Sequence, residues 1–236
     1  MVESAAKGTA LGTSREDYLA GIYRLQSTGQ SVGTGDVAQR LGISPASTSA
    51  MFKRLVREGL VQHESYGDVS LTEEGARLAA AVVRRHRILE RFLTDVLGIG
   101  WDEVDAYADR MEHAVPDEVL TAMEGLLGAP ATCPHGYPIP VGGELAPADG
   151  QPLSALRAGE RAVVRRVDES DPKLLRYLRS CGLVPGAALE VRERNDVDGT
   201  RVLSVAEQTI VVGTRIAEAL AVEAVAEFEV CADGHS

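Results

Sequence analysis

The chain has 236 residues, more than one compact domain usually contains, so at least two folding units joined by a linker are expected. Hydrophobic residues make up 44% and charged residues 25%, a globular composition, and no apolar run is long enough to span a bilayer. The net charge of −11 excludes a protein that coats nucleic acid non-specifically, because phosphate binding depends on Lys and Arg. Three scattered cysteines and an N-terminus without a signal-like pattern predict a reducing, cytoplasmic compartment.

The N-terminal part predicts a helix, a second short helix, a tight turn and a third helix. Residues 14–25 have an acidic first turn and apolar positions at helical spacing. A short amphipathic helix over 36–41 ends at a glycine, and a Ser-Pro pair then begins the next helix, 44–58. Two β-prone runs within 59–72 flank a Ser-Tyr-Gly-Asp turn, which predicts a hairpin.

This order of elements is typical of a winged helix-turn-helix, in which the helix over 44–58 enters the major groove of DNA. Small and hydroxyl-bearing residues at its start permit close approach to base edges, and the basic residues that follow can reach phosphates. The alternative is a small helical domain with solvated basic residues, but a hairpin directly after the helices favours DNA binding. The residues predicted to contact DNA are Ser44, Pro45, Ala46, Ser47, Thr48, Ser49, Ala50, Lys53, Arg54 and Arg57.

The middle part predicts two helices that carry histidines and carboxylates at helical spacing. One spans residues 76–97, and the next begins at residue 101. The carboxylates on the second helix form one stripe and repel one another unless a cation or a basic partner lies between them. Spacing alone leaves open a metal site and a surface helix paired with arginines. The candidate ligands are His86, Glu90, Asp105, Asp109, Glu112 and His113, a set of nitrogen and oxygen donors that suits Mn²⁺ or Fe²⁺.

Residues 129–149 are rich in Pro, Gly and Ala and include Cys133 and His135. These two side chains could be metal ligands, but three prolines and the absence of a second Cys/His pair favour a fixed turn. The stretch after Pro140 is predicted to be a linker.

The C-terminal part changes from helical periodicity to apolar alternation. Short strands with glycine-bearing turns predict a small barrel like those of SH3-like folds, interrupted by a single helix over 172–181. Acidic residues before that helix could add a ligand to the middle site or could simply favour the helix N-terminus. The predicted strands cover 161–167, 188–192, 202–205, 209–212 and 226–230, and the acidic residues are Asp168, Glu169 and Asp171.

Over nearly its whole length the chain resembles the DtxR/MntR family of metal-dependent repressors. The residues that carry the resemblance are 16–23, 44–45, 59–61, 71–72, 83–87 with Glu90, 111–113 with 117–118, and 135–140. The resemblance implies a mainly α protein with a small β domain. Its domains would be a winged helix-turn-helix over 1–74, a helical metal-binding and dimerisation domain over 75–140, a linker over 141–153 and an SH3-like, FeoA-like domain over 154–236.

The resemblance also assigns the candidate ligands to two sites. One is implied to contain Asp17, Asp109, Glu112 and His113, and the other His86 and Glu90, with Asp105 and Asp171 as further members. Iron-type members resemble one another in having Met and Cys where this chain has Asp17 and Asp109, and manganese-type members have carboxylates. Hard oxygen ligands favour Mn²⁺. Ala20 stands where two-domain manganese regulators carry Glu, a departure from their closely spaced binuclear arrangement.

The predicted function is therefore a Mn²⁺-activated repressor of metal-uptake genes, a homodimer that binds a palindromic double-stranded operator and is not an enzyme. An Fe²⁺-dependent regulator of the same family is the alternative. A metal-dependent hydrolase is a rival from another class, but a nucleophile, a glycine-rich phosphate loop and a separate general base are not evident. A regulator that senses an organic ligand or a partner protein through its C-terminal part is a further alternative.

Overall fold

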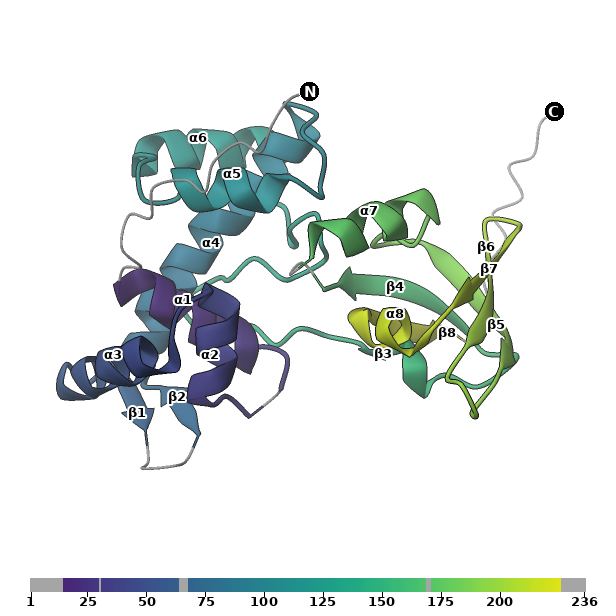
Figure 1. The fold of residues 1–236 in the computed structure, drawn as a ribbon. Coiled ribbons are helices and arrows are strands. Elements are labelled where there is room, and N and C mark those ends of the chain that lie inside the picture. Colours follow the sequence, from purple (N-terminus) through teal and green to yellow (C-terminus); the bar gives the residue numbers. More distant parts are fainter. Residues whose placement is uncertain (1–14, 30, 64–67, 169–170, 226–236) are drawn as a thin grey trace, which may run out of the picture. The chain divides into compact units, whose positions relative to one another are not determined.

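The computed structural model describes residues 15–29, 31–168 except 64–67, and 171–225 (Figure 1). The chain divides into two compact units, Met1–Arg87 with Pro138–Ala148, and Ile88–Tyr137 with Asp149–Ser236. Each unit has its own hydrophobic core. The predicted helix start at Ser14, most of the hairpin turn and the strand predicted over 226–230 lie outside the described residues.

The first unit contains the predicted helix-turn-helix and hairpin. Gly42 adopts a left-handed conformation (φ 64°) that ends the second helix, and the Ser44 hydroxyl accepts a hydrogen bond from the backbone N–H of Ser47 (3.2 Å), which begins the third. The two short strands pair antiparallel, as the sequence predicts. These elements are α1 (Arg15–Gln26), α2 (Thr34–Leu41), α3 (Pro45–Arg57), β1 (Val61–His63) and β2 (Val69–Leu71).

A close backbone contact joins the hairpin to the helix that follows it. Helix α4 (Glu73–Asp95) begins against Leu60, and a Cβ atom at Gly75 would lie 1.9 Å from the Leu60 carbonyl oxygen. Only glycine fits there, so Gly75 fixes where the start of α4 meets the winged helix-turn-helix. Helix α4 continues into the second unit.

Residues 138–148, called the strap here, belong to the first unit although they overlap the predicted linker. The Tyr23 hydroxyl on α1 donates to the Glu144 carbonyl and accepts from the Ala146 N–H, both at 2.9 Å. The Ala148 N–H donates to the Ser27 carbonyl (2.8 Å). The strap is therefore hydrogen-bonded to the first helix of the DNA-binding part.

The second unit begins with the last turns of α4 and adds α5 (Val104–Met111) and α6 (Asp117–Leu127). Helix α5 is shorter than predicted, because Glu112 caps its end and His113 lies in the turn beyond. Helix α6 starts after Pro116 and ends at Gly128, which has a left-handed conformation (φ 69°).

The C-terminal part of the second unit is one antiparallel sheet of six strands in the order β3-β8-β4-β5-β6-β7. Alternate residues of β6 are buried, in agreement with the apolar alternation of the sequence, and in β4 the alternation shifts by one residue after Val164, where the pairing with β8 is irregular. The strands are β3 (Gln151–Pro152), β4 (Arg161–Val167), β5 (Ala188–Arg194), β6 (Arg201–Val205), β7 (Gln208–Val212) and β8 (Leu220–Val225).

The prediction of a single helix in this part is wrong. Besides α7 (Pro172–Ser180), the structure contains α8 (Thr214–Ala219) and the 3₁₀ turn η1 (Leu153–Ala155). Helix α8 has six residues, and Gly213 before it provides no side-chain cap, so the local signals of a helix start are absent.

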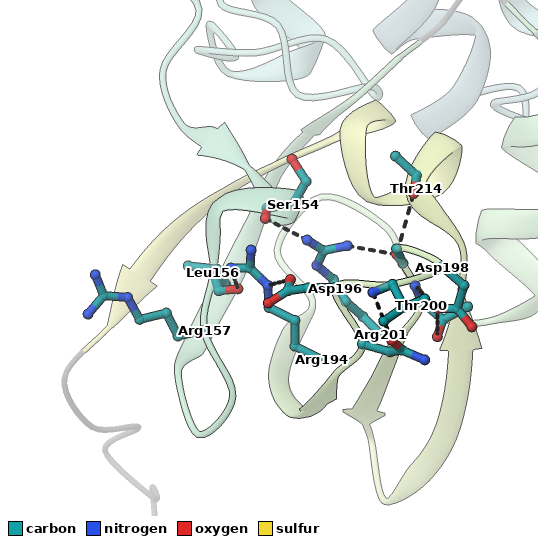
Figure 2. Close-up of polar contacts among 12 residues, drawn as sticks. Ser154, Leu156, Arg157, Arg194, Asp196, Asp198, Thr200, Arg201 and Thr214 are labelled. Atoms are coloured by element: carbon teal, nitrogen blue, oxygen red, sulfur yellow. Dashed lines mark hydrogen bonds and ion pairs between the residues drawn. The ribbon is translucent and has the colours of Figure 1, made fainter.

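A buried arginine connects the β5–β6 loop to the 3₁₀ turn by hydrogen bonds. Arg201 is 5% exposed and donates to the carbonyl oxygens of Gly199 (2.8 Å) and Ser154 (2.7 Å). Figure 2 shows its guanidinium between Ser154 and the loop, where Asp198 also accepts from the backbone and hydroxyl of Thr200. These bonds replace solvation of the buried guanidinium and make the loop part of the fold.

The loop Cys133 to Tyr137 packs against β4 within the second unit. The Val167 N–H donates to the His135 carbonyl (3.0 Å), and a Cβ atom at Gly136 (φ 91°) would lie 1.9 Å from the Arg165 carbonyl oxygen. The side chain of Trp101, from the segment before α5, belongs to the core of the sheet. In the described part of the chain no helix is long and apolar enough to cross a membrane.

Candidate functional site

Helix α3 presents nearly all of the residues predicted to contact DNA. Nine of the ten are exposed or partly exposed. Thr48 differs, because its side chain is buried and its hydroxyl donates to the Ser44 carbonyl (3.2 Å). Thr48 therefore stabilises the first turn of α3 and has no free surface for a base.

A carboxylate at the end of α3 pairs with two basic side chains. Glu58 accepts from Arg54 Nε (2.8 Å) and from Arg15 Nη1 of α1 (3.2 Å). The hydrogen bond from Arg54, with a smaller contribution from Arg15, lowers the pKa of Glu58. Glu58 therefore remains negative at neutral pH and offsets part of the positive charge beside the predicted DNA-contacting face.

Five of the predicted ligands in the second unit lie on or near α5. A carboxylate oxygen of Glu90 and one of Asp105 lie within 4.8 Å of each other, and the same holds for Asp109 and Glu112. His113 Nε2 lies 3.3 Å from Glu112 Oε1. Glu90 and Glu112 are buried, at 0% and 6% exposure, so these carboxylates are largely withdrawn from water.

Two further predicted ligands belong to the first unit. Asp17 lies in the acidic first turn of α1. His86 is 1% exposed on α4, one helical turn before Glu90, and the two residues share a face of this continuous helix as the sequence predicts.

Asp171 caps the N-terminus of α7. One of its carboxylate oxygens accepts from the Lys173 N–H (2.9 Å) and the other from Arg215 (2.7 Å). The hydrogen bond from the Lys173 backbone, followed by that from Arg215, lowers the pKa of this carboxyl. Its role as a metal ligand stays a prediction.

A cluster of Glu90, Cys133 and His135, called the buried cluster here, joins α4 to the Cys133–Tyr137 loop. The three residues are at most 1% exposed, and one potential ligand atom from each lies within 4.8 Å of the other two. His135 Nδ1 lies 3.2 Å from Glu90 Oε1, and His135 Nε2 lies 2.7 Å from the Trp101 carbonyl oxygen. The imidazole also stacks on the Trp101 indole, with 5.5 Å between ring centroids.

The sequence predicted a fixed turn here and favoured it over metal ligation. The turn is present, since the Cys133 N–H donates to the Tyr137 carbonyl (2.8 Å) and the Gly136 N–H to the Cys133 carbonyl (3.0 Å). The proximity of Glu90 was not foreseen, because it depends on how the loop packs against α4. The Cys-Pro-His spacing was the one local signal that could have indicated the cluster.

The pKa of the buried His135 ring is strongly raised by its neighbours. Burial by itself lowers the pKa of an imidazole, but attraction to the Glu90 carboxylate and hydrogen bonds to Cys133 and Glu90 raise the pKa of His135 to about 12. Without a metal, the proton on His135 therefore neutralises the buried carboxylate.

The donor chemistry of the clusters fits divalent cations of two kinds. With the His135 and Cys133 protons removed, the buried cluster offers one nitrogen, one thiolate sulfur and one carboxylate, a set that suits Zn²⁺, Fe²⁺ or Co²⁺. Asp109, Glu112 and His113 offer only oxygen and nitrogen, which suits Mn²⁺ or Fe²⁺ better.

Three family profiles match consecutive parts of the chain. Residues 10–69 match the N-terminal DNA binding domain of iron dependent repressors, residues 72–141 their metal binding and dimerisation domain, and residues 151–224 the FeoA domain. These matches confirm the predicted fold, with a DNA-binding domain, a helical domain and an SH3-like domain in that order.

Known proteins resemble the chain over most of its length. The iron-dependent repressor IdeR of Mycobacterium tuberculosis is 34% identical over 223 residues, which cover 89% of this chain and 96% of IdeR. A manganese-dependent transcriptional repressor in complex with manganese has a TM-score of 0.84 and 36% identity, covering 90% of this chain and all (100%) of that one. ScaR with bound Zn²⁺ has a TM-score of 0.76 and 30% identity, with 90% and 100% coverage. The chain therefore belongs to the DtxR/MntR family of metal-dependent transcriptional repressors.

Proposed function

We propose that this repressor senses Mn²⁺ in the cytoplasm and, as a homodimer on a palindromic operator, controls genes of metal uptake. The observation that carries the proposal is the grouping of Asp109, Glu112 and His113 around the end of α5, with no sulfur donor among them. Hard oxygen ligands match Mn²⁺. A relative of 36% identity is described as manganese-dependent and in complex with manganese.

Asp17, Asp109, Glu112 and His113 would hold the activating ion, and His86, Glu90 and Asp105 a second one. Asp171 stays a further candidate for the second set. The bound cation would supply the positive charge that offsets repulsion among the carboxylates.

Asp17 links this ligand set to DNA recognition through α1. Tyr18, Leu19 and Ile22 of the same helix are buried in a core that also contains Phe52 and Leu55 of α3. An ion that fixes the position of Asp17 would therefore also fix the position of α3 through this shared core. When the carboxylates repel one another, the spacing of the two α3 helices in a dimer is not fixed, and operator half-sites cannot be matched in register.

The experiment that tests this proposal uses DNA selected by the protein itself. A random duplex library is enriched on the full chain with Mn²⁺, and the affinity of the enriched duplex is measured by fluorescence anisotropy with Mn²⁺ and with EDTA. We expect at least about tenfold tighter binding with Mn²⁺, a coupling typical of allosteric ligands. His113→Ala should lose this difference, whereas Glu118→Gln, an exposed carboxylate on α6, should keep it. Equal affinity with and without metal would overturn the proposal.

Iron is the second candidate effector, and a specific observation favours it. The buried cluster contains Cys133, whose thiolate binds Fe²⁺ better than Mn²⁺. The same titration with Fe²⁺ under anaerobic conditions decides between the two ions. Activation by Fe²⁺ with little or no activation by Mn²⁺ would make iron the effector, because a lower Fe²⁺ midpoint alone is what the usual affinity order of the two ions gives.

A further inference from the structure

Trp101 contacts His135 through both its backbone and its side chain. The Trp101 carbonyl oxygen lies 2.7 Å from His135 Nε2, and the indole stacks on the imidazole at an interplanar angle of 23°. A carbonyl oxygen can only accept a hydrogen bond, so Nε2 must carry the proton. The opposite nitrogen, Nδ1, is then the atom that faces Glu90, at 3.2 Å from Oε1.

The protonation of Nε2 decides which atom of His135 can bind a metal. A neutral imidazole that donates from Nε2 has its free electron pair on Nδ1. Ligating histidines commonly donate their other N–H to a carbonyl or carboxylate, which fixes both the tautomer and the ring orientation. The Trp101 carbonyl is such an acceptor for His135, since it faces Nε2 while Nδ1 faces the buried cluster.

The indole of Trp101 is anchored in the C-terminal core and not by a hydrogen bond. It is 7% exposed and packs in the core with Leu153, Leu175 and Leu203, and its N–H has no acceptor among the described residues. The next residue, Asp102, pairs with Arg176 of α7 at 3.3 Å. The segment that orients His135 is therefore fixed by the SH3-like part of the same unit.

We propose that Trp101 is a positioning residue for a metal ion in the buried cluster. Its carbonyl holds the proton of His135 on Nε2 and presents Nδ1 to the ion, and its indole connects this orientation to the core of the C-terminal sheet. Metal binding at the cluster therefore depends on how the Trp101 side chain itself is held in that core. The inference rests on Glu90, Cys133 and His135 acting as metal ligands, which the Co²⁺ band below tests separately from the proposed response to Mn²⁺.

The test uses Co²⁺ as the probe, because a thiolate bound to Co²⁺ gives a charge-transfer absorption in the near ultraviolet. Anaerobic titration of the full chain should produce this band, and Cys133→Ala should lack it. Trp101→Leu keeps the backbone carbonyl but removes the indole that stacks on the imidazole and holds this segment in the core, so Co²⁺ binding should weaken by about 10-fold, the lower end of the cost of disturbing a group that orients a ligand. Trp101→Phe retains an aromatic ring over the imidazole and should stay within about threefold of the wild type.

Leu203→Ala is the matched control, since Leu203 is fully buried in the same core. It should lower the unfolding temperature but leave Co²⁺ affinity within about threefold of the wild type, because nothing next to His135 changes. If Leu203→Ala weakens Co²⁺ binding as much as Trp101→Leu does, the effect is only core stability and the inference is wrong. Wild-type affinity in Trp101→Leu also overturns it.

A measurement on the unaltered chain tests the orientation directly. In ¹⁵N-histidine-labelled protein loaded with Zn²⁺, long-range ¹H–¹⁵N spectra identify which ring nitrogen is protonated, and His135→Gln assigns the signals. We expect a proton on Nε2 and metal on Nδ1. The opposite tautomer would overturn the role of the Trp101 carbonyl. Absence of the Cys133-dependent Co²⁺ band would instead overturn the cluster as a metal site, and with it this inference.

Discussion

At the scale of single residues, Glu58 limits how strongly the N-terminal part can attract DNA. Its carboxylate accepts from Arg54 and Arg15, so both guanidinium groups are partly neutralised before DNA arrives. In a chain of net charge −11, such local pairing determines how much positive charge faces the phosphates.

We expect Glu58→Gln to strengthen non-specific DNA binding by about three- to tenfold at low salt. One or two additional cationic contacts to phosphate should also steepen the dependence of log K on log salt by about one to two units. Anisotropy titrations of a scrambled duplex over a series of salt concentrations measure both quantities. The control is Glu74→Gln, which removes the exposed Glu74–Arg77 pair on α4. An unchanged salt slope in Glu58→Gln would show that Arg15 and Arg54 do not reach phosphates.

His135 and Glu90 differ in what their loss costs the metal-free protein. Without His135, the buried Glu90 carboxylate loses the imidazolium that lies 3.2 Å from its Oε1, and losing one partner of a buried pair costs about 3–5 kcal/mol. Without Glu90, the imidazole can become neutral at little cost above about pH 6.5. We therefore expect His135→Gln to lower the free energy of unfolding more than Glu90→Gln at pH 8, as measured by urea denaturation in EDTA.

The same pair has a defined pH dependence. Because the pKa of His135 is raised to about 12 in the folded chain, the pair contributes fully below the unfolded value near 6.5. Its contribution then decreases as the pH rises towards 12. A wild type whose metal-free stability falls no more steeply from pH 7 to 9.5 than that of Glu90→Gln would contradict this assignment.

At the scale of elements, the sequence predicted those helices and strands whose ends or faces are marked by local signals. Gly42 and the Ser44-Pro45 start define the ends of α2 and α3, and apolar alternation predicted β4 and β6. Helix α8 was missed because it has no cap and only six residues. The strap was missed for another reason. Its order comes from Tyr23, which is distant in sequence, and composition alone describes a linker.

The candidate metal ligands divide in the same way. His86 and Glu90 share a helix, so helical periodicity was enough to place them on one face. The buried cluster combines a helix with a loop, and its assembly depends on the close approach of Gly136 to β4. Sequence periodicity contains no information about such a contact.

We expect Tyr23→Phe to release the strap from α1. The variant leaves the Ala146 N–H and the Glu144 carbonyl without their partner, at a cost of about 1–3 kcal/mol. Limited proteolysis should then cut within 141–148 several times faster than in the wild type, with the sites identified by mass spectrometry. Tyr107→Phe changes a more exposed hydroxyl on α5 and serves as the control. Equal cleavage rates in all three proteins would show that the hydroxyl does not hold the strap.

At the scale of the whole molecule, the donor set proposed for the activating ion and the buried cluster have different metal preferences. The group around the end of α5 has only oxygen and nitrogen donors, whereas the buried cluster adds the sulfur of Cys133. Oxygen donors favour Mn²⁺, and thiolate favours Zn²⁺ or Co²⁺. Under the proposed assignment, one ion would activate the repressor while a different ion would stabilise its second unit.

This division predicts that a substitution in one set changes only the Zn²⁺ titration and a substitution in the other changes only the Mn²⁺ titration. Cys133→Ser should remove the tight step of a Zn²⁺ titration measured by calorimetry. It should also remove the rise in unfolding temperature that Zn²⁺ causes, because an ion that binds the folded state stabilises it. It should leave the Mn²⁺ midpoint for operator binding within about threefold of the wild type, a change below the usual range of allosteric coupling. His113→Ala should shift the Mn²⁺ midpoint and keep the tight Zn²⁺ step. If both substitutions shift both titrations equally, the two sets act as one site, and the assignment of separate roles fails.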